Sequence, residues 1–375
     1  MEARKVLVLN AGSSSLKYEV IGLPDASRLL RGHVEEIAAG EFGPALDRVV
    51  QEIGREGLAP LSAVGHRVVH GGPRHTTPEL VDDELLASID DLARLAPLHN
   101  PGAAEGIRRA RDAFAGVPQV AVFDTAFFAT LPRAATTYAL DAALTAAEDI
   151  RRYGMHGTSH QYVATEAAAF LGADLDDLDL ISLHLGNGAS AAAISGGRAV
   201  ETSMGFTPLE GLVMGTRAGD VDPGVLLHLL RHTGLETGAL DELLNHRSGL
   251  RGLSGTSDLR EVLAAADSGD PSAGLALDVY CHRIRKYVGA YLAVLGGADA
   301  IVFTAGVGEN VPRVRKSALA GLHRLGIEID DDHNEATAQG PRMISPDGSG
   351  IKVLVVPTDE ELAIARLVAD VLDWT

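Results

Sequence analysis

The chain alternates between short apolar runs and longer segments in which hydrophobic residues recur with helical spacing. Six apolar runs have the length and composition of buried strands, and most end in Gly, Asn, Asp or Thr: 6–10, 63–69, 119–124, 180–186, 300–306 and 352–358. Ala- and Leu-rich segments between them predict helices at 102–115, 159–171, 223–232, 257–267, 273–295 and 359–372. This alternation is typical of an α/β protein whose sheets are covered by helices.

A weak internal duplication refines this prediction. The segment VLVLNAGSSSLKYEVIG at 6–22 predicts a strand, a turn of small residues and a second strand. The segment at 180–205 repeats that plan and adds a further hairpin closed by Gly196 and Gly197. Two copies predict two similar domains facing one cleft. We expect them to span 1–150 and 151–358, with the helix at 359–375 packed back on the first.

Composition excludes several classes of function. A chain of 375 residues is long enough for two domains with separate cores. The net charge of -19, without a Lys/Arg cluster, argues against a nucleic-acid or anionic-membrane surface. No apolar run is long enough for a membrane span or, after MEARK, for a signal peptide. A single cysteine, Cys281, excludes an intrachain disulfide and a thiolate metal cage, which favours the cytoplasm.

Three turns of small residues are candidates for contact with a nucleotide. The turn at 10–17, NAGSSSLK, places backbone amides, hydroxyls and an ammonium after a strand, a suitable cradle for phosphoryl oxygens. It lacks the P-loop spacing, and alone it is equally well explained as a Gly/Ser-rich hairpin. The turn at 184–190, HLGNGAS, holds the corresponding place in the second copy. In FTAGVGEN, at 303–310, the glycines admit close approach of a ligand, and we expect the EN pair to begin a helix whose amino end favours an anion.

Charged residues at strand ends and in glycine-flanked loops are the candidates for chemistry. Arg67 in GHRVVHGG and Arg217 in MGTRAGDVDPG offer planar forks of donors for a carboxylate or a phosphoryl group, although surface salt bridges would also explain them. Asp124 ends a predicted strand, and Glu360 begins a predicted helix after another. Both carboxylates suit Mg²⁺, and a helix cap or first-turn acid is the alternative.

The string YGMHGTSH places His156 and His160 four residues apart, a spacing that on a helix suits a metal. The string lacks the glutamate of a HExxH motif, and Thr158 or Ser159 has the character of a helix cap. We therefore expect His156 to donate a hydrogen bond to a phosphoryl oxygen. For His160 a structural role is the alternative to a functional one.

Taken in order, these strings resemble the acetate kinase family. Ten of them, from NAGSSSLKYEV to PTDEELAIA, span residues 10–365, and the ordered set is specific although each string alone is not. The resemblance places the chain in the superfamily of actin, sugar kinases and heat-shock ATPases. It implies duplicated ribonuclease H-like (actin-like ATPase) domains with mixed sheets flanked by helices, and an active site in the interdomain cleft.

The resemblance also implies a role for individual residues. Asp124, His156 and Arg217 would be catalytic, Asn10 and Glu360 would contribute to a Mg²⁺ site, and His99 matches a further site histidine. Arg67 would bind the substrate carboxylate, beside an apolar acyl pocket of Val69, Leu98, Met155 and Pro208. The nucleotide would contact Ser13, Ser15, Lys17, His184, Leu185, Gly186, Asn187, Gly188, Asp258, Leu259, Arg260, Gly306, Val307, Gly308, Glu309 and Asn310.

The implied activity is reversible transfer of the γ-phosphoryl group of ATP to acetate, giving acetyl phosphate and ADP, with Mg²⁺ as the metal and Mn²⁺ as its alternative. A propionate or butyrate kinase is the nearest alternative, because Met155 stands where the family usually has phenylalanine. A nucleotide-driven switch or filament is an alternative from another class, but it would leave the paired arginines unexplained. Asp359, often asparagine in the family, adds a charge beside the proposed metal ligand. The resemblance also implies a homodimer.

Overall fold

The computed structural model describes residues 4–11, 15–35, 37, 42–97 and 99–374. The chain forms two compact units. Unit 1 comprises Met1–Ala129, Met155–Ser159 and Asp359–Thr375, and unit 2 comprises Thr130–Gly154 and His160–Thr358. The domain boundary that we expect near residue 150 from the sequence stays a prediction.

Unit 1 is built on a six-stranded mixed sheet of order β3-β2-β1-β4-β6-β5. Antiparallel pairing joins β1, β2 and β3, parallel pairing joins β1, β4 and β6, and β5 pairs antiparallel with β6. The strands are β1 (Arg4–Ala11), β2 (Leu16–Leu23), β3 (Ser27–Val34), β4 (Ala63–Val68), β5 (Glu79–Leu80) and β6 (Gln119–Phe123).

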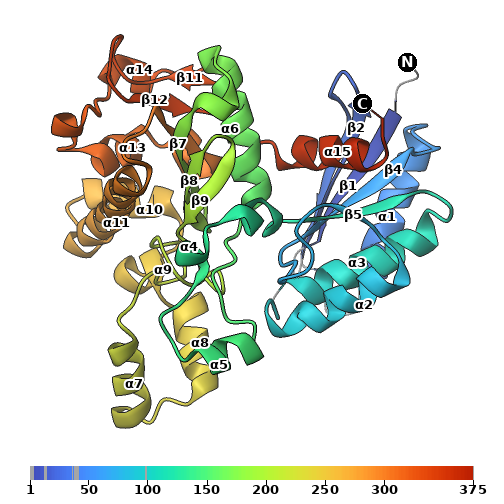
Figure 1. Cartoon of the computed structure of the whole chain (residues 1–375), viewed down its shortest axis with the longest axis horizontal. Coiled ribbons are helices and arrows are strands. Elements are labelled where there is room, and N and C mark those ends of the chain that lie inside the picture. The colour runs from blue at the N-terminus through green and yellow to red at the C-terminus, as the bar shows by residue number, and fades with distance from the viewer. Residues whose placement is uncertain (1–3, 12–14, 36, 38–41, 98, 375) are drawn as a thin grey trace. The chain divides into compact units, whose positions relative to one another are not determined.

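Helices cover both faces of this sheet, as Figure 1 shows. On one face lie α1 (Phe42–Arg55), α2 (Asp83–Asp91) and α3 (Asn100–Ala113), and on the other lies α15 (Glu360–Val371). The strands alternate accordingly: Leu7 and Leu9 of β1 belong to the core cluster under α1, and they are almost fully buried. On the α15 face, Gly65 of β4 leaves room for Ile364 and Val368, since a Cβ there would lie 2.8 Å from each. The 3-10 turns of this unit are η1 (Leu92–Arg94) and η2 (Ala126–Thr130, whose last residue belongs to unit 2).

Unit 2 contains a second six-stranded mixed sheet, of order β11-β12-β10-β7-β8-β9. Read from the other edge, its strand order and directions reproduce those of unit 1: three antiparallel strands, two further parallel ones and an antiparallel edge strand. Each sheet also has one register shift at the corresponding place, between β2 and β3 in unit 1 and between β8 and β9 in unit 2. The strands are β7 (Asp179–Leu185), β8 (Ala189–Ser195), β9 (Arg198–Thr202), β10 (Ala300–Thr304), β11 (Arg342–Met343) and β12 (Lys352–Val355). The duplication expected from the sequence is therefore present in the topology.

The longest helix of unit 2, α11 (Pro271–Leu295), packs on β7 and β8, and α9 (Gly249–Ser254), α10 (Leu259–Asp267) and α13 (Pro312–Leu319) pack on α11. The other helical elements are α4 (Arg133–Thr136), α5 (Ala142–Ala147), α6 (Gly157–Leu171), η3 (Leu175–Asp177), α7 (Pro223–His232), α8 (Thr237–His246), α12 (Ala305–Asn310), η4 (His323–Leu325) and α14 (Asp331–Glu335). In the described part of the chain, no helix is both long and apolar enough to cross a membrane.

All six predicted strands and all six predicted helices form, within a few residues of their expected bounds, and the expected α/β class is confirmed. One local prediction is wrong: Glu309 and Asn310 end a helix instead of beginning one. Helix α12 begins directly after β10, at Ala305, and Pro312 then starts the next helix. The region 22–60 contains the edge strand β3 and helix α1, neither of which is among the predicted elements.

Candidate functional site

In unit 1, the carboxyl ends of β1, β4 and β6 bring four predicted residues together. Arg67 lies near the end of β4, Asn10 near the end of β1, Asp124 directly after β6, and Glu360 at the first position of α15. The Arg67 guanidinium donates to Asn10 Oδ1 at 3.2 Å and to Asp124 Oδ2 at 2.5 Å. Its Nε lies 3.5 Å from Glu360 Oε2. We call these four residues the Arg67 cluster.

The Arg67 cluster is buried and carries more negative than positive charge. The side chain of Asp124 is 1% exposed, and those of Arg67 and Glu360 are 18% and 16% exposed. The pKa of Glu360 is raised to about 7, mainly by burial and also by the charge of Asp124, although Arg67 opposes both effects. Conversely, the two carboxylates outweigh burial and raise the pKa of Arg67, which remains protonated. One guanidinium therefore faces two carboxylates, and the cluster favours an additional cation.

The segment 155–159 rests against Asp124. Thr158 donates its hydroxyl to Asp124 Oδ1 at 3.1 Å, and the Gly157 amide donates to the Asp124 carbonyl at 3.0 Å. A Cβ on Gly157 would lie 2.1 Å from that carbonyl, so only glycine fits. His156 precedes α6 with a positive φ of 61°, and Met155 is buried. The cap expected at Thr158 or Ser159 does not form, because α6 begins at Gly157 and Thr158 instead orients the carboxylate.

Other predicted residues of unit 1 lie on the same strands or beside them. Lys17 is exposed on β2 opposite Asn10, and its charge acts on Glu360. Ser15 immediately precedes β2, Val69 follows β4, and His99 precedes α3; all three are half-buried. Ser13 and Leu98 lie outside the described residues.

The departure at Asp359 has a structural explanation. Its carboxylate caps α15 by accepting from the Leu362 amide at 3.0 Å, and it pairs with Arg28 of β3. Arg28 also pairs with Glu19 at 2.8 Å, so the additional charge at position 359 is neutralised by a neighbour outside the Arg67 cluster.

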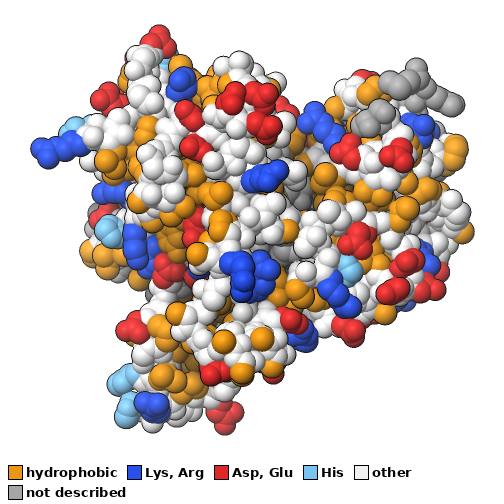
Figure 2. Space-filling view, viewed as in Figure 1, with side chains coloured by type: hydrophobic (Ala, Val, Ile, Leu, Met, Phe, Trp, Pro, Cys, Tyr) orange, Lys and Arg blue, Asp and Glu red, His pale blue; other side chains and the backbone are white. Residues whose placement is uncertain are grey.

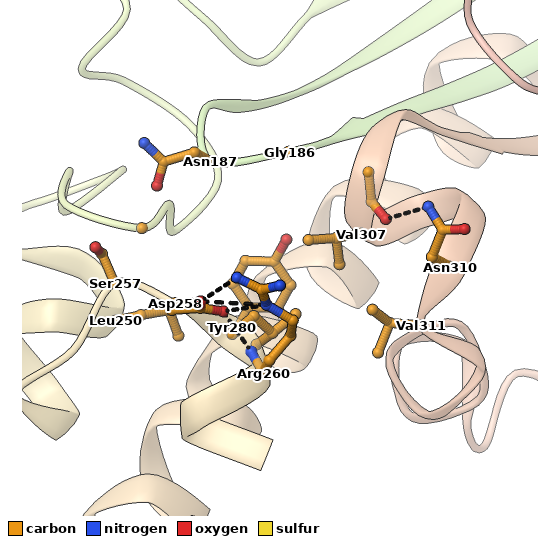
Figure 3. A pocket seen from close by; sticks show the side chains of 13 residues that line it. Gly186, Asn187, Leu250, Ser257, Asp258, Arg260, Tyr280, Val307, Asn310 and Val311 are labelled. Atoms are coloured by element: carbon orange, nitrogen blue, oxygen red, sulfur yellow. Dashed lines mark hydrogen bonds and ion pairs between the residues drawn. The ribbon is translucent and has the colours of Figure 1, made fainter. Parts of the chain in front are cut away.

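Unit 2 contains a cavity of about 620 Å³ at the carboxyl ends of β7 and β10. Figure 3 shows its thirteen lining residues, of which eight are among the predicted nucleotide contacts: Gly186, Asn187, Asp258, Leu259, Arg260, Gly306, Val307 and Asn310. The other five are Gly215, Leu250, Ser257, Tyr280 and Val311. Five further predicted contacts do not line it: His184, Leu185, Gly188, Gly308 and Glu309.

The walls of this cavity combine apolar surface with a few polar groups, the composition expected of a small-molecule pocket. Asp258 caps α10 and holds Arg260 in a two-pronged ion pair, with nitrogen–oxygen distances of 2.6 and 3.0 Å (Figure 3). Asn310 donates to the Gly306 carbonyl at 2.9 Å across α12. Leu250, Val307 and Val311 supply apolar surface from different elements.

The loop that bears Arg217 forms part of the same wall. Gly215 lines the cavity and donates its amide to the Asn187 carbonyl at 3.0 Å. Burial lowers the pKa of Arg217, and in the described part of the chain no carboxylate pairs with it; the guanidinium lies 4.0 Å from the Met214 sulfur. An arginine left in this state is suited to an anion supplied by a ligand. Pro208, predicted for the acyl pocket, is half-buried in the preceding segment of unit 2.

The two histidines of HGTSH do not share a metal site. His160 is fully buried between Ser182 and Ser190, at 2.8 and 2.7 Å, and burial together with nearby His184 holds its pKa well below the usual range. The structural alternative for His160 is therefore correct. Within the described residues, no group of three or more His, Cys, Asp or Glu side chains is arranged to hold a metal.

Sequence reasoning missed Arg315, which is the largest fully buried side chain among the described residues. It donates to the Gly308 and Glu309 carbonyls, both at 2.9 Å, and to Asn334 Oδ1 at 2.8 Å, which fixes the end of α12 beside the cavity. Its partners are mainly main-chain carbonyls, which no sequence pattern reveals. The sequence indicates Thr158 and Gly215 only weakly, because they lie in the strings YGMHGTSH and MGTRAGDVDPG.

Comparison with known proteins identifies the family. The sequence profile of the Acetokinase family matches residues 41–366. This chain belongs to the acetokinase family. It is similar to the acetate kinases of Clavibacter michiganensis subsp. michiganensis, at 55% identity over 96% of this chain and 97% of that protein, and of Streptomyces avermitilis, at 50% identity over 98% and 97%.

Solved structures of the acetokinase family agree with this fold. The acetate kinase of Porphyromonas gingivalis is 41% identical and superposes with a TM-score of 0.93 over 98% of this chain and 100% of that one. A propionate kinase from Francisella tularensis is 38% identical, with a TM-score of 0.90 over 97% and 98%. The resemblance stated from the ordered strings is confirmed.

Proposed function

We propose that this chain is an acetate kinase, which transfers the γ-phosphoryl group of ATP to acetate and gives acetyl phosphate and ADP, reversibly. The observation that carries this conclusion is the match, along nearly the whole chain, to acetokinase family members named acetate kinase. The Arg67 cluster in unit 1 and the cavity in unit 2 supply the chemistry that such a reaction needs. That the two meet at one site stays a prediction from the sequence.

In unit 1, Arg67 would bind the substrate carboxylate. Its guanidinium uses two nitrogens on Asn10 and Asp124, and its Nε has no hydrogen-bond partner in the described part of the chain. Five N–H donors on a planar fork leave several for an incoming carboxylate. Asp124 holds the fork in place and is itself held by Thr158. Because acetate is already ionised at neutral pH, Asp124 would orient charges and would not remove a proton.

In unit 2, the cavity would hold the nucleotide and Arg217 would stabilise charge on the transferring phosphoryl group. Phosphoryl transfer passes through a loose, highly anionic transition state, so positioning and cationic donors matter most. Arg217 is half-buried without a carboxylate partner in the described residues, which leaves its charge available for such a state. His156 is proposed as a second donor, and the roles of Val69, Met155 and Pro208 in an acyl pocket remain proposals of the same kind.

The Arg67 cluster also fits a Mg²⁺ ion. Asn10, Asp124 and Glu360 offer the oxygen ligands that Mg²⁺ prefers, and the excess negative charge that raises the pKa of Glu360 would be offset by a cation. Mg²⁺ characteristically takes one or two carboxylates together with water and substrate phosphates, so a small protein ligand set suffices. When bound, the ion would neutralise charge on the phosphoryl oxygens. We propose Asn10 and Glu360 as its protein ligands.

A propionate kinase is the second candidate, favoured by the Francisella structure and by Met155. One methylene changes specificity by about 1–3 kcal/mol, so neighbouring acids should overlap as substrates. We also propose a homodimer and a cytoplasmic location. Exposed apolar residues in unit 2, Leu140 and Leu144 at α5 and Val225 and Leu227 on α7, would suit a subunit interface. Figure 2 shows hydrophobic side chains at the surface in the region of these helices.

The test is acyl-phosphate formation, trapped as the hydroxamate, from MgATP with acetate, propionate and butyrate. The highest kcat/KM for acetate would support the proposal, and preference for a longer acid would move the assignment to the neighbouring enzyme. ATP turnover that no acid stimulates would refute both and favour a nucleotide switch.

A further inference from the structure

The loop that carries Arg217 has a narrow neck. Gly211 and Asp220 close it by two hydrogen bonds: the Asp220 amide donates to the Gly211 carbonyl at 3.0 Å, and the Gly211 amide donates to Asp220 Oδ1 at 2.9 Å. Gly219 has a φ of +70°, and a Cβ there would lie 2.5 Å from the Gly211 carbonyl oxygen. The two chain segments that enter and leave the loop are therefore as close as glycine allows.

Two side chains of α11 fasten this neck. Tyr287 donates its hydroxyl to the Asp220 carboxylate, at 3.0 and 3.1 Å from the two oxygens. Arg283 donates to the carbonyl oxygens of Gly211 and Asp220, at 3.0 and 3.3 Å, and forms an ion pair with the Asp220 carboxylate at 3.4 Å. Burial and the charge of Asp220 raise the pKa of Tyr287, so its hydroxyl stays a donor.

The tip of the loop is held mainly by main-chain contacts, and the Thr216 hydroxyl adds one hydrogen bond by donating to the Asn245 carbonyl at 2.8 Å. The Met214 amide donates to the Arg217 carbonyl at 3.1 Å, and the Ser248 amide donates to the Thr216 carbonyl at 3.0 Å. Gly249 packs so closely that a Cβ would lie 2.2 Å from the Met214 carbonyl. The direction of the Arg217 side chain is thus set by the backbone of its loop, since the described residues provide no carboxylate to orient it.

We propose that Asp220, together with Tyr287 and Arg283, positions Arg217 for phosphoryl transfer without touching a substrate. This inference rests on the proposed function, in which Arg217 stabilises the transition state. A shift of about 1 Å in a transition-state donor is enough to lower a rate by orders of magnitude, so loosening the neck should act on kcat. It should leave the KM for acetate nearly unchanged, because the substrate carboxylate is proposed to bind Arg67 and not this loop.

The chain offers a matched pair of variants on α11. Tyr287→Phe removes the hydroxyl that holds Asp220, whereas Tyr291→Phe removes a buried hydroxyl that has no hydrogen-bond partner in the described part of the chain. The two rings pack edge to face, with centroids 5.7 Å apart. We expect Tyr287→Phe to lower kcat about 5- to 10-fold and Tyr291→Phe to change it less than about 2-fold. Asp220→Asn, which keeps the acceptor for the Gly211 amide, should resemble Tyr287→Phe.

The decisive measurement repeats Tyr287→Phe in an Arg217→Ala background. If Tyr287 acts through Arg217, Tyr287→Phe should lower kcat less than about 2-fold in the Arg217→Ala background. A general loss of stability would not produce this non-additivity. Equal fold losses in both backgrounds, or equal kcat values for the two Tyr→Phe variants, would overturn the positioning role while leaving the proposed function intact. A wild-type chain without acid-dependent acyl-phosphate formation would overturn both.

Discussion

Arg67→Lys separates the geometry of the Arg67 cluster from its charge. Arg67 reaches Asn10, Asp124 and Glu360 from three different nitrogens, at 3.2, 2.5 and 3.5 Å. Lysine keeps the positive charge but has one nitrogen, so it cannot hold these groups and also present a planar pair of donors to a carboxylate. Because the positive charge is retained, the net charge of the Arg67 cluster is unchanged and the fold should survive.

The size of the effect follows from the hydrogen bonds that lysine cannot make. A hydrogen bond to a charged group contributes about 1.5–3 kcal/mol, and removing one such bond to the substrate carboxylate corresponds to a decrease of about 10- to 150-fold in kcat/KM for acetate. The KM for MgATP should change much less, since the cavity proposed for the nucleotide is lined by residues of unit 2.

The assay is initial-rate kinetics with acetate varied at saturating MgATP and MgATP varied at saturating acetate. Arg28→Lys is the matched control, because Arg28 also bridges two carboxylates in unit 1, Glu19 and Asp359, but lies outside the Arg67 cluster. We expect the control to stay within about 3-fold of wild type, because lysine keeps the charge that pairs with Glu19 and Asp359 and neither carboxylate belongs to the Arg67 cluster. A thermal melt of each variant checks folding.

Two results would refute this reasoning. A kcat/KM for acetate within about 3-fold of wild type in Arg67→Lys would show that the planar fork is not used for the substrate. An equal rise in the KM values for acetate and MgATP would indicate a general disturbance of the protein and not the loss of a hydrogen bond to the carboxylate.

Three further predictions concern single residues. Asp124→Asn should lower kcat by about 100-fold without a new acidic limb in the pH profile, because Asp124 orients Arg67; a rate restored at high pH alone would contradict this. Arg217→Ala should lower kcat by about 100-fold with no loss of thermal stability, since burial already disfavours its charge; a pure KM effect would be inconsistent with transition-state stabilisation. Burial lowers the pKa of His66 from 6.5 to about 4. As the pH drops from 6.5 towards 4, His66 therefore stays neutral in the folded chain but takes up a proton in the unfolded chain, and the free energy of unfolding falls. Between pH 7 and 5 this contributes about 2 kcal/mol, and His66→Gln should reduce the fall in urea unfolding free energy by that amount; an unchanged pH dependence would refute the assignment.

The sequence predicts the buried strands well, because they appear as apolar runs. Asp124 is visible as the polar residue that ends such a run, and Arg67 as a charge that interrupts one. The edge strand β3 lacks such a run because its residues are largely exposed, and the sequence pattern does not predict it.

Interactions with main-chain atoms are beyond prediction from the sequence. Arg315 and Arg283 hold loops through carbonyl oxygens that come together only in the folded chain. The extent of α12 is also mispredicted, because its glycines suggest a turn, yet Gly306 and Gly308 both lie inside the helix.

The central claim, that a carboxylate oxygen attacks the γ-phosphorus of ATP, is tested most directly by isotope transfer. Acetate labelled with ¹⁸O in both oxygens is turned over with MgATP, the product is cleaved at its carbonyl carbon with hydroxylamine, and the released phosphate is examined by ³¹P NMR. The account predicts one ¹⁸O in the phosphate and ADP as the nucleotide product. Unlabelled phosphate, or label in AMP, would contradict it.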